Sequence, residues 1–295
     1  MKTQLKADLM LVLVTVFWGS SCPFTKIALE DLDEFNLTAI RFFIGFILPV
    51  IFLFSKLKTD KKTILYAALV SFNYFFVVAL MTFGVRYTTA SKAGFLTCLA
   101  GVFVPIICVF LFKAKLDKKT VFCVITTFIG VYLLTMGGAS GNLGVNIGDI
   151  LCTLCSLFFA VHIILIGFIV KRVDAITLTV WQMGFVSLYN MIASLIFETP
   201  HLPTTGLTWL NVFWLGAVCS IGGALFQNIA QKHTSETHAG IIFTIEPVFA
   251  VGFAYAFLGE LLTFWGYIGA AILLASIVLL EIDTTNIRIT RASKR

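Results

Sequence analysis

The segment that decides the fold is Arg86–Leu96, RYTTASKAGFL, because the chain contains it twice. The second copy is Lys232–Ile242, KHTSETHAGII, which begins at position 232 instead of position 86, an offset of 146 residues. Both copies run from a basic residue through an aromatic ring and two hydroxyl side chains to an Ala-Gly pair. An offset of about half the chain predicts a tandem duplication, with halves at 1–147 and 148–295.

The match extends beyond this segment in two registers. At the offset of 146 residues, Leu116 falls on Leu262. At an offset of 141 residues, which relates the earlier parts of the halves, Asp8 falls on Asp149. The difference between the two offsets indicates one insertion or deletion near the second or third helix.

The composition excludes a soluble globular protein. Of the 295 residues, 59% are hydrophobic and 12% are charged, and the mean hydropathy is +0.99. Soluble domains carry about twice that share of charged residues, so the predicted partner of this surface is the lipid bilayer. The net charge of +6 comes from Lys and Arg clusters between apolar runs. Such clusters act as topology determinants, so we predict no nucleic-acid partner.

The seven cysteines lie within or at the edges of apolar runs. Cys152 and Cys155 form a CxxC pair, but the chain has no second one. A metal or redox site needs more ligands than this pair supplies. We therefore predict reduced thiols, no metal and no cofactor. The chain also lacks a clustered nucleophile and base, so we do not expect an enzyme.

Ten apolar runs are long enough to cross a bilayer as helices, which takes about 20 residues each. They are continuous and lack the alternation of a membrane β-barrel, so the predicted fold class is all-α integral membrane. The duplication assigns five transmembrane helices to each half. The runs are 7–29, 36–54, 63–84, 91–112, 120–137, 148–170, 175–197, 208–231, 238–258 and 264–281.

The loop charges predict the orientation of these helices. Nearly all Lys and Arg residues of the loops and tails lie on the side that holds both termini, whereas Glu30 and Asp31 lie on the other side. The positive-inside rule therefore predicts that both termini of this multi-pass protein are cytoplasmic. The membrane that we predict is the plasma membrane, the cytoplasmic membrane of a bacterium. Because each half has an odd number of helices, the two five-helix repeats must be inverted. Inverted repeats are typical of secondary transporters.

Glu246 is the most informative polar residue within the predicted spans. It lies near the middle of 238–258 and is followed by Pro247, which we expect to kink the helix. Ionisable side chains inside a membrane are costly and are candidates for function. The Glu246 carboxyl group would bind a cationic group of a substrate or carry a proton as the coupling ion. The alternative is a protonated Glu that hydrogen-bonds another helix.

Four more residues within the spans are candidates for substrate binding. Trp18 would form the floor of a central cavity, and His162 would shuttle protons or stack on substrate. Asn73 and Gln227 would hold substrate through their amides. The alternative for each of the four is a role in helix packing.

Lys26 and Arg41 lie near the outer ends of the first and second spans. We expect both side chains to reach the membrane interface and to pair with the acidic residues of 30–34. The alternative is an anion site at the mouth of a cavity.

Four motifs stand out: FWGSS at 17–21 with Lys26, Arg41–Phe42, RYTTASKAGFL at 86–96 and IEPVFAVGFAYAFLGELLT at 245–263. With these motifs, the chain resembles the EamA-type ten-helix transporters of the drug/metabolite transporter superfamily over nearly its whole length. The first half departs from the family pattern at two places: it has Ala100–Gly101 where the second half has Glu246–Pro247, and Lys113–Ala114 where the second half has Gly259–Glu260.

The resemblance implies a secondary transporter that exports amino acids, other metabolites or drugs, by facilitated diffusion or by exchange. It also implies a central cavity lined by the first, third, fourth, sixth, eighth and ninth helices. We therefore predict an exporter of small metabolites such as amino acids that works by alternating access. A lipid-linked carrier or flippase and a structural membrane protein without transport are the alternatives. The helices that line the implied cavity hold all five candidates, Trp18, Asn73, His162, Gln227 and Glu246.

Overall fold

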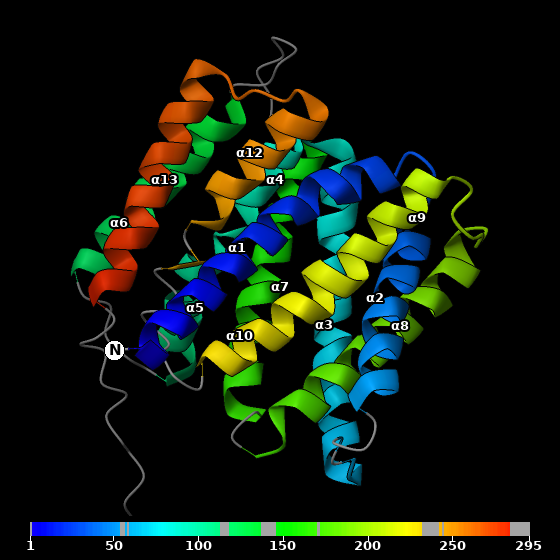
Figure 1. Ribbon diagram of the computed structural model, residues 1–295. Coiled ribbons are helices and arrows are strands. Elements are labelled where there is room, and N and C mark those ends of the chain that lie inside the picture. Colours follow the sequence, from blue (N-terminus) through cyan, green and yellow to red (C-terminus); the bar gives the residue numbers. More distant parts are fainter. Residues whose placement is uncertain are drawn as a thin grey trace, which may run out of the picture.

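The protein is a bundle of helices that pack side by side (Figure 1). The computed structural model describes residues 2–53, 57, 59–112, 118–136, 146–169, 172–231, 242–243 and 245–283. Within these ranges the chain forms helices and their connections, and no strand. The all-α fold class predicted from the sequence is therefore confirmed.

Helices occupy all ten predicted spans. Among the described residues, six helices are long and apolar enough to cross a membrane, and four shorter apolar helices lie at 90–104, 121–135, 246–258 and 264–279. The first half contains α1 (Lys2–Ala28), α2 (Glu34–Leu53), α3 (Lys61–Tyr87), α4 (Ala90–Thr97), α5 (Ala100–Phe112) and α6 (Lys118–Met136). The second half contains α7 (Ile147–Ile169), α8 (Ala175–Phe197), α9 (Gly206–Phe213), η2 (Trp214–Gly222), α10 (Gly223–Gln231), α12 (Glu246–Leu258) and α13 (Phe264–Asp283).

Two of the predicted spans are irregular. A turn at Cys98–Leu99 divides the fourth span into α4 and α5. In the eighth span, η2 is a π-helix, a rare geometry that is frequent at functional sites. Both irregularities lie in helices that the sequence placed around the centre of the molecule.

Pro247 lies at the start of a helix, and the kink expected there stays a prediction because 238–241 and 244, in the preceding part of the ninth span, lie outside the described residues. α12 begins at Glu246, and the proline therefore occupies its first turn. At that position a missing N–H costs no helical hydrogen bond, and the fixed backbone angle of proline suits the helix start. Glu246 is thus the first residue of a helix that starts within the ninth predicted span.

The two halves pack through pairs of equivalent helices. α2 packs against its counterpart α8, and α6 packs against its counterpart α13. α3 packs along α7, and the equivalent contact joins the α9–η2–α10 segment to α1. Likewise α7 packs on α4 and α5, as α1 packs on α12. Exchange of the halves therefore reproduces the same packing, which is the symmetry expected of a duplicated chain.

Contacts at one end of the bundle establish that the halves are inverted. Lys26 lies in the last turn of α1, and Asp149 lies in the first turn of α7. Both contact Thr88, which joins α3 to α4: Lys26 Nζ is 2.7 Å from the Thr88 carbonyl oxygen, and Thr88 Oγ1 is 2.5 Å from Asp149 Oδ1. α1 therefore ends where its counterpart α7 begins, so the two helices run in opposite directions. We call this end of the bundle the Thr88 end.

Glycines allow the paired helices to approach closely. A Cβ atom at Gly130 of α6 would lie 2.8 Å from the carbonyl oxygen of Gly269 in α13. A Cβ atom at Gly148 of α7 would lie 2.6 Å from the Thr88 nitrogen. Small residues are the usual means of helix association in membranes, where burial of apolar surface supplies little driving force.

Large apolar side chains cover the outside of the bundle. Phe52 is 77% exposed and Phe197 is 74% exposed, as expected of side chains that face lipid. Inside, hydroxyl groups bond to the backbone of their own helix, as Thr82 Oγ1 does to the Val78 carbonyl oxygen at 2.7 Å. A polar group in a bilayer must find its partner within the protein, and these bonds meet that need.

Candidate functional site

Trp18 lies at the contact between α1 and η2. Its Nε1 donates a hydrogen bond to the Cys219 carbonyl oxygen at 3.0 Å, and its ring centroid lies 5.4 Å from that of Phe243. Gly223 leaves room for the indole, because a Cβ atom there would lie 2.5 Å from Nε1. The Trp18 N–H is thus used to join the two halves.

Glu246 lies beside α1 at the depth of Trp18. A Cβ atom at Gly19, the next residue of α1, would lie 3.0 Å from the Glu246 carbonyl oxygen. The Glu246 side chain is partly exposed, and no hydrogen bond or ion pair joins its carboxyl group to another residue in the described part of the chain. A carboxyl group inside a membrane protein without a protein partner is available to a ligand or a proton.

Gln227 belongs to the same group of residues. It lies on α10, one helical turn after Gly223, against which the Trp18 indole packs. Its side chain is partly exposed, and its amide bonds to none of the described residues. Trp18, Gln227 and Glu246 therefore lie where α1 meets α10 and α12, and their role as one binding site stays a prediction.

His162 belongs to a second group, on α3, α7 and α8. Its ring centroid lies 4.5 Å from that of Tyr74, and its Nε2 lies 3.4 Å from Nε2 of Gln182. The side chain is buried, and its Nδ1 has no hydrogen-bond partner among the described residues. The same holds for Oδ1 of Asn73, the neighbour of Tyr74. Buried polar atoms without a partner are costly, so water or a ligand is expected at both.

Arg41 is a central residue that the sequence analysis placed at the membrane interface. Its Nε donates to Ser220 Oγ of η2 at 2.8 Å, and its guanidinium carbon lies 5.3 Å from the centroid of the Phe42 ring. It forms no ion pair with residues 30–34, all of which are described, so that expectation was wrong. Ser220 follows Cys219, whose carbonyl oxygen accepts from Trp18 Nε1, so Arg41 lies near Trp18 between the halves.

The repeat offsets in the sequence relate Arg41 to residues of the second group. At the offset of 141 residues, Arg41 is the counterpart of Gln182, which contacts His162. At the offset of 146 residues, its partner Ser220 is the counterpart of Tyr74. The pair of Arg41 and Ser220, which joins the two halves, therefore corresponds to the pair of Gln182 and Tyr74, which also has one member in each half.

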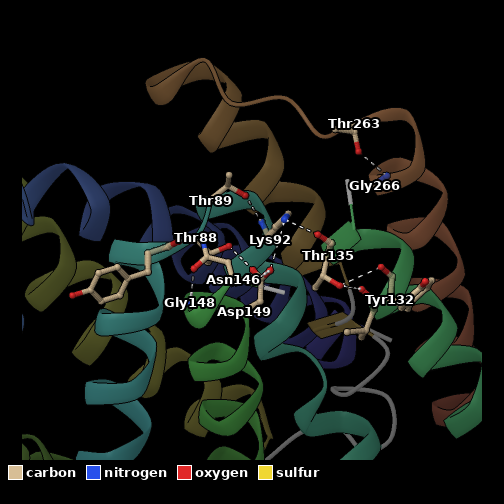
Figure 2. Close-up of polar contacts among 12 residues, drawn as sticks. Thr88, Thr89, Lys92, Tyr132, Thr135, Asn146, Gly148, Asp149, Thr263 and Gly266 are labelled. Atoms are coloured by element: carbon tan, nitrogen blue, oxygen red, sulfur yellow. Dashed lines mark hydrogen bonds and ion pairs between the residues drawn. The ribbon is translucent and has the colours of Figure 1, made fainter. Parts of the chain in front are cut away.

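A further polar cluster lies at the Thr88 end, around the segment Thr88–Lys92 (Figure 2). Lys92 Nζ lies 3.7 Å from Asp149 Oδ2 and donates to the Thr135 carbonyl oxygen at 3.1 Å. Thr88 Oγ1 donates to the other oxygen of the same carboxylate. Lys92 is 7% exposed and Asp149 is 1% exposed. Water cannot solvate such buried charges, so they depend on these partners.

Asn146 extends this cluster to the turn before α7 (Figure 2). Its Nδ2 donates to the Tyr87 carbonyl oxygen, and its Oδ1 accepts from the Gly148 N–H at 3.0 Å. These bonds fix the start of α7 against the end of α3. They thereby position Asp149 beneath Thr88.

The other side of the Thr88–Lys92 segment contacts α1 and the residues after α12. Lys26 Nζ lies 3.0 Å from Glu260 Oε1 and donates to the Thr88 carbonyl oxygen at 2.7 Å. Glu260 Oε2 accepts from the Ser91 N–H at 3.2 Å. Lys26 therefore pairs with Glu260 and not with the acidic residues of 30–34, contrary to the expectation. The two side chains are 30% and 14% exposed.

The loops of the Thr88 end are bonded to one another as well. Arg86 pairs with Glu34 and lies 3.7 Å from Asp33. Asp31, after α1, accepts hydrogen bonds from the Thr204 N–H at 2.9 Å and from its hydroxyl at 2.6 Å. These hydrogen bonds lower the pKa of Asp31 below its ordinary value of 3.8.

Comparisons of this chain with known proteins agree on one family. Residues 5–136 and 146–282 each match the model of the EamA-like transporter family. An uncharacterized transporter of Archaeoglobus fulgidus is 32% identical over 279 residues, which cover 95% of this chain and 87% of that protein. A probable amino-acid metabolite efflux pump of Salmonella typhimurium is 25% identical over 304 residues, 98% of each chain. A solved crystal structure superimposes with a TM-score of 0.66 at 16% identity over 94% of this chain and 96% of that one, which shows a shared fold.

Proposed function

Because the chain belongs to the EamA-like transporter family, we propose that it exports small metabolites such as amino acids across the plasma membrane. Family membership makes it a multi-pass membrane transporter of a small-molecule substrate. The relative in Salmonella typhimurium is named a probable amino-acid metabolite efflux pump, which supports both the substrate class and the direction. In the protein itself, the proposal depends above all on the Glu246 carboxyl group, which has no partner among the described residues.

Glu246 and Arg41 suit the two charges of an amino acid. The unpaired carboxyl group of Glu246 is free to bind an ammonium group. The Arg41 guanidinium uses Nε for Ser220 and keeps further N–H donors for a carboxylate. An uncharged solute would leave both charges without a partner in a region of low dielectric, which is unfavourable.

The remaining predicted residues would surround the rest of the substrate. The ring faces of Trp18 and His162 would contact its apolar part, and the amides of Asn73 and Gln227 would form hydrogen bonds with it. Glu246 and His162 are also the groups that would carry a proton if export is coupled to proton entry.

The inverted halves support alternating access as the mechanism. In transporters of this kind, substrate binds near the midplane between the repeats, and one repeat or bundle of helices moves against the other. We propose 1–147 and 148–295 as the two repeats. By the loop charges, both termini are cytoplasmic, which places the Thr88 end on the outer side of the membrane.

The test is counterflow in proteoliposomes. Vesicles would be preloaded with single amino acids, and uptake of the same labelled amino acid would be measured with and without a pH gradient. The matched probes are the amide and the N-acetyl derivative of each amino acid, which lack one of the two charges. Uptake of the zwitterion with weak uptake of both derivatives is the expected result.

Two other results would contradict the proposal. Equal uptake of the zwitterion and its derivatives would remove the roles of Arg41 and Glu246 in recognising charge. No counterflow with any amino acid, from a protein that elutes as a single folded species, would reject the amino-acid substrate class.

A further inference from the structure

We propose that Lys26 and Glu260 form a releasable latch that keeps the Thr88 end of the transporter closed. The latch acts on the segment Thr88–Lys92, which joins α3 to α4 and is bonded on two sides. The inference rests on the proposed alternating access, but it concerns residues at one end of the bundle and not the substrate site at its centre.

One side of the segment is anchored to α7. Thr88 Oγ1 donates to Asp149 at 2.5 Å, and Lys92 Nζ lies 3.7 Å from the same carboxylate. α3 and α7 also pack along each other, with no room for a side chain at Gly148. The segment and α7 therefore form one unit.

The opposite side of the segment is held by α1 and the residues after α12, which pack on each other. Lys26 donates to the Thr88 carbonyl oxygen at 2.7 Å, and Glu260 accepts from the Ser91 N–H at 3.2 Å. The 3.0 Å ion pair between Lys26 and Glu260 holds these two groups in place for the segment. The segment thus bridges a unit that contains α7 and a unit that contains α1.

The burial of the charged side chains determines which contacts of the segment can break. The anchor consists of a lysine and a carboxylate that are both almost fully buried, and loss of either partner would leave the other charge uncompensated. The latch side chains are 30% and 14% exposed, so water can solvate the Lys26 ammonium group and the Glu260 carboxylate when the segment moves away from them. Contacts of partly exposed charges contribute less than contacts of buried ones, so the bonds from Lys26 to Thr88 and from Ser91 to Glu260 break first. The Thr88 end should therefore open between the segment and the Lys26–Glu260 pair.

The latch belongs to one end of the molecule. At the offset of 141 residues the counterpart of Lys26 is Gly167, and at the offset of 146 residues the counterpart of Glu260 is Ala114. Neither counterpart carries a charge, although the counterpart of Asp149 is Asp8. The Lys26–Glu260 pair therefore has no charged counterpart at these two offsets, and it stabilises the state in which the Thr88 end is closed. With the proposed topology, that resting state is closed toward the outside.

The experiment is hydrogen exchange of the full chain in lipid nanodiscs, measured by mass spectrometry on peptides that cover 93–97. These amides lie in α4 just after the segment and bond to neither latch residue. The variants are Lys26→Met, Glu260→Gln and the double variant. The matched control is Glu34→Gln, which breaks an ion pair at the same end, with Arg86, within the first half.

We expect amide exchange at 93–97 to become about threefold to fivefold faster in each single latch variant. This is the change in the opening equilibrium that corresponds to the loss of a partly exposed ion pair. Glu34→Gln should leave this exchange unchanged. Unchanged exchange in both single variants would overturn the latch. An equal increase in Glu34→Gln would do so as well, because it would indicate general loosening of this end.

A second measurement tests opening itself. Ser91 is 1% exposed and its hydroxyl has no hydrogen-bond partner among the described residues, so Ser91→Cys removes no bond. In a chain whose native cysteines are replaced, this thiol should react with a membrane-impermeant reagent about threefold to fivefold faster once Lys26→Met is added. No change in the rate would contradict the proposal. Neither measurement needs a substrate, so a failed latch and a failed amino-acid transport assay are separate results.

Discussion

Thr88 Oγ1 lies 2.5 Å from a carboxylate oxygen of Asp149, and this hydrogen bond joins the two halves of the chain. Thr88 lies between α3 and α4, whereas Asp149 is in the first turn of α7. The approach is possible because Gly148, next to Asp149, has no side chain to collide with the backbone of Thr88. A hydroxyl donor to a buried carboxylate offsets part of the cost of removing that charge from water.

Thr88→Val should lower the free energy of unfolding by about 2 kcal/mol, because the substitution keeps the shape and removes a donor to a charged acceptor. Thr153→Val in α7 is the matched control, since the Thr153 hydroxyl bonds only to the Asp149 carbonyl oxygen of its own helix among the described residues. Thermal unfolding in detergent would compare the two. Equal losses of unfolding free energy would mean that the hydrogen bond between the halves contributes no more than a hydroxyl bond within one helix.

Asp149→Asn and Glu260→Gln should differ in their effect on stability, although both neutralise a carboxylate paired with a lysine. We expect a loss of about 3 kcal/mol for Asp149→Asn, because Lys92 would remain buried without its counter-charge. For the partly exposed Glu260 we expect about 1 kcal/mol or less. Denaturant or thermal unfolding would measure both. A larger loss for Glu260→Gln would contradict the division into a buried anchor and a releasable latch.

Gly130→Ala should separate α6 from α13, because its Cβ atom would lie 2.8 Å from the Gly269 carbonyl oxygen. The expected loss is about 1–3 kcal/mol, as for other overpacked interiors. Gly252→Ala in α12 is the control, since a Cβ atom there meets nothing within 4 Å. Thermal unfolding and yield of folded protein would be compared. Similar stability of the two variants would show that these helices can move apart without cost.

Glu246→Gln should reduce counterflow of a zwitterionic amino acid by about tenfold to a hundredfold, the range for losing one charge-assisted hydrogen bond. If protons drive export, the pH dependence of flux should disappear as well. Glu30→Gln is the control, because Glu30 is an exposed carboxylate at the Thr88 end. Flux and a pH profile like those of the unsubstituted protein would rule out Glu246 as a binding or coupling group.

Asp31 should stabilise the loop contact with Thr204 only where its carboxyl group is ionised. Hydrogen bonds from Thr204 lower the folded-state pKa below the ordinary value of 3.8. A lowered pKa gives a contribution that is present above the unfolded-state value and is lost as the pH falls through the folded-state value. Thr204→Val should therefore melt at a lower temperature than the unsubstituted protein at pH 6, and the difference should shrink below about pH 4. A difference that is independent of pH would contradict this assignment.

The fold was largely predictable because its evidence is local or periodic along the chain. The lengths of the apolar runs gave the helices, and the repeat of Arg86–Leu96 as Lys232–Ile242 gave the duplication. The break at Cys98–Leu99 and the π-helix at Trp214–Gly222 were not predictable in this way. Both keep the hydrophobic composition of an ordinary span, so hydropathy cannot reveal them.

The candidate residues of the site could be selected from the sequence, but their contacts could not. Glu246 and Gln227 are polar residues in apolar runs, which was enough to select them. Their lack of hydrogen-bond partners among the described residues became known only from the packing of α10 and α12 against α1. Arg41 was assigned to the interface because residues near a helix end can reach either water or the interior.

The sequence by itself determined that this protein is a duplicated and inverted membrane protein, because hydropathy, loop charge and repeat register are all read along the chain. Only the tertiary structure decided which charges meet. Lys26 is 234 positions from Glu260, and Arg41 is 179 positions from Ser220. Pairing across such distances depends on the rotation and depth of each helix, and these are fixed by side-chain packing between helices that the order of residues alone does not specify.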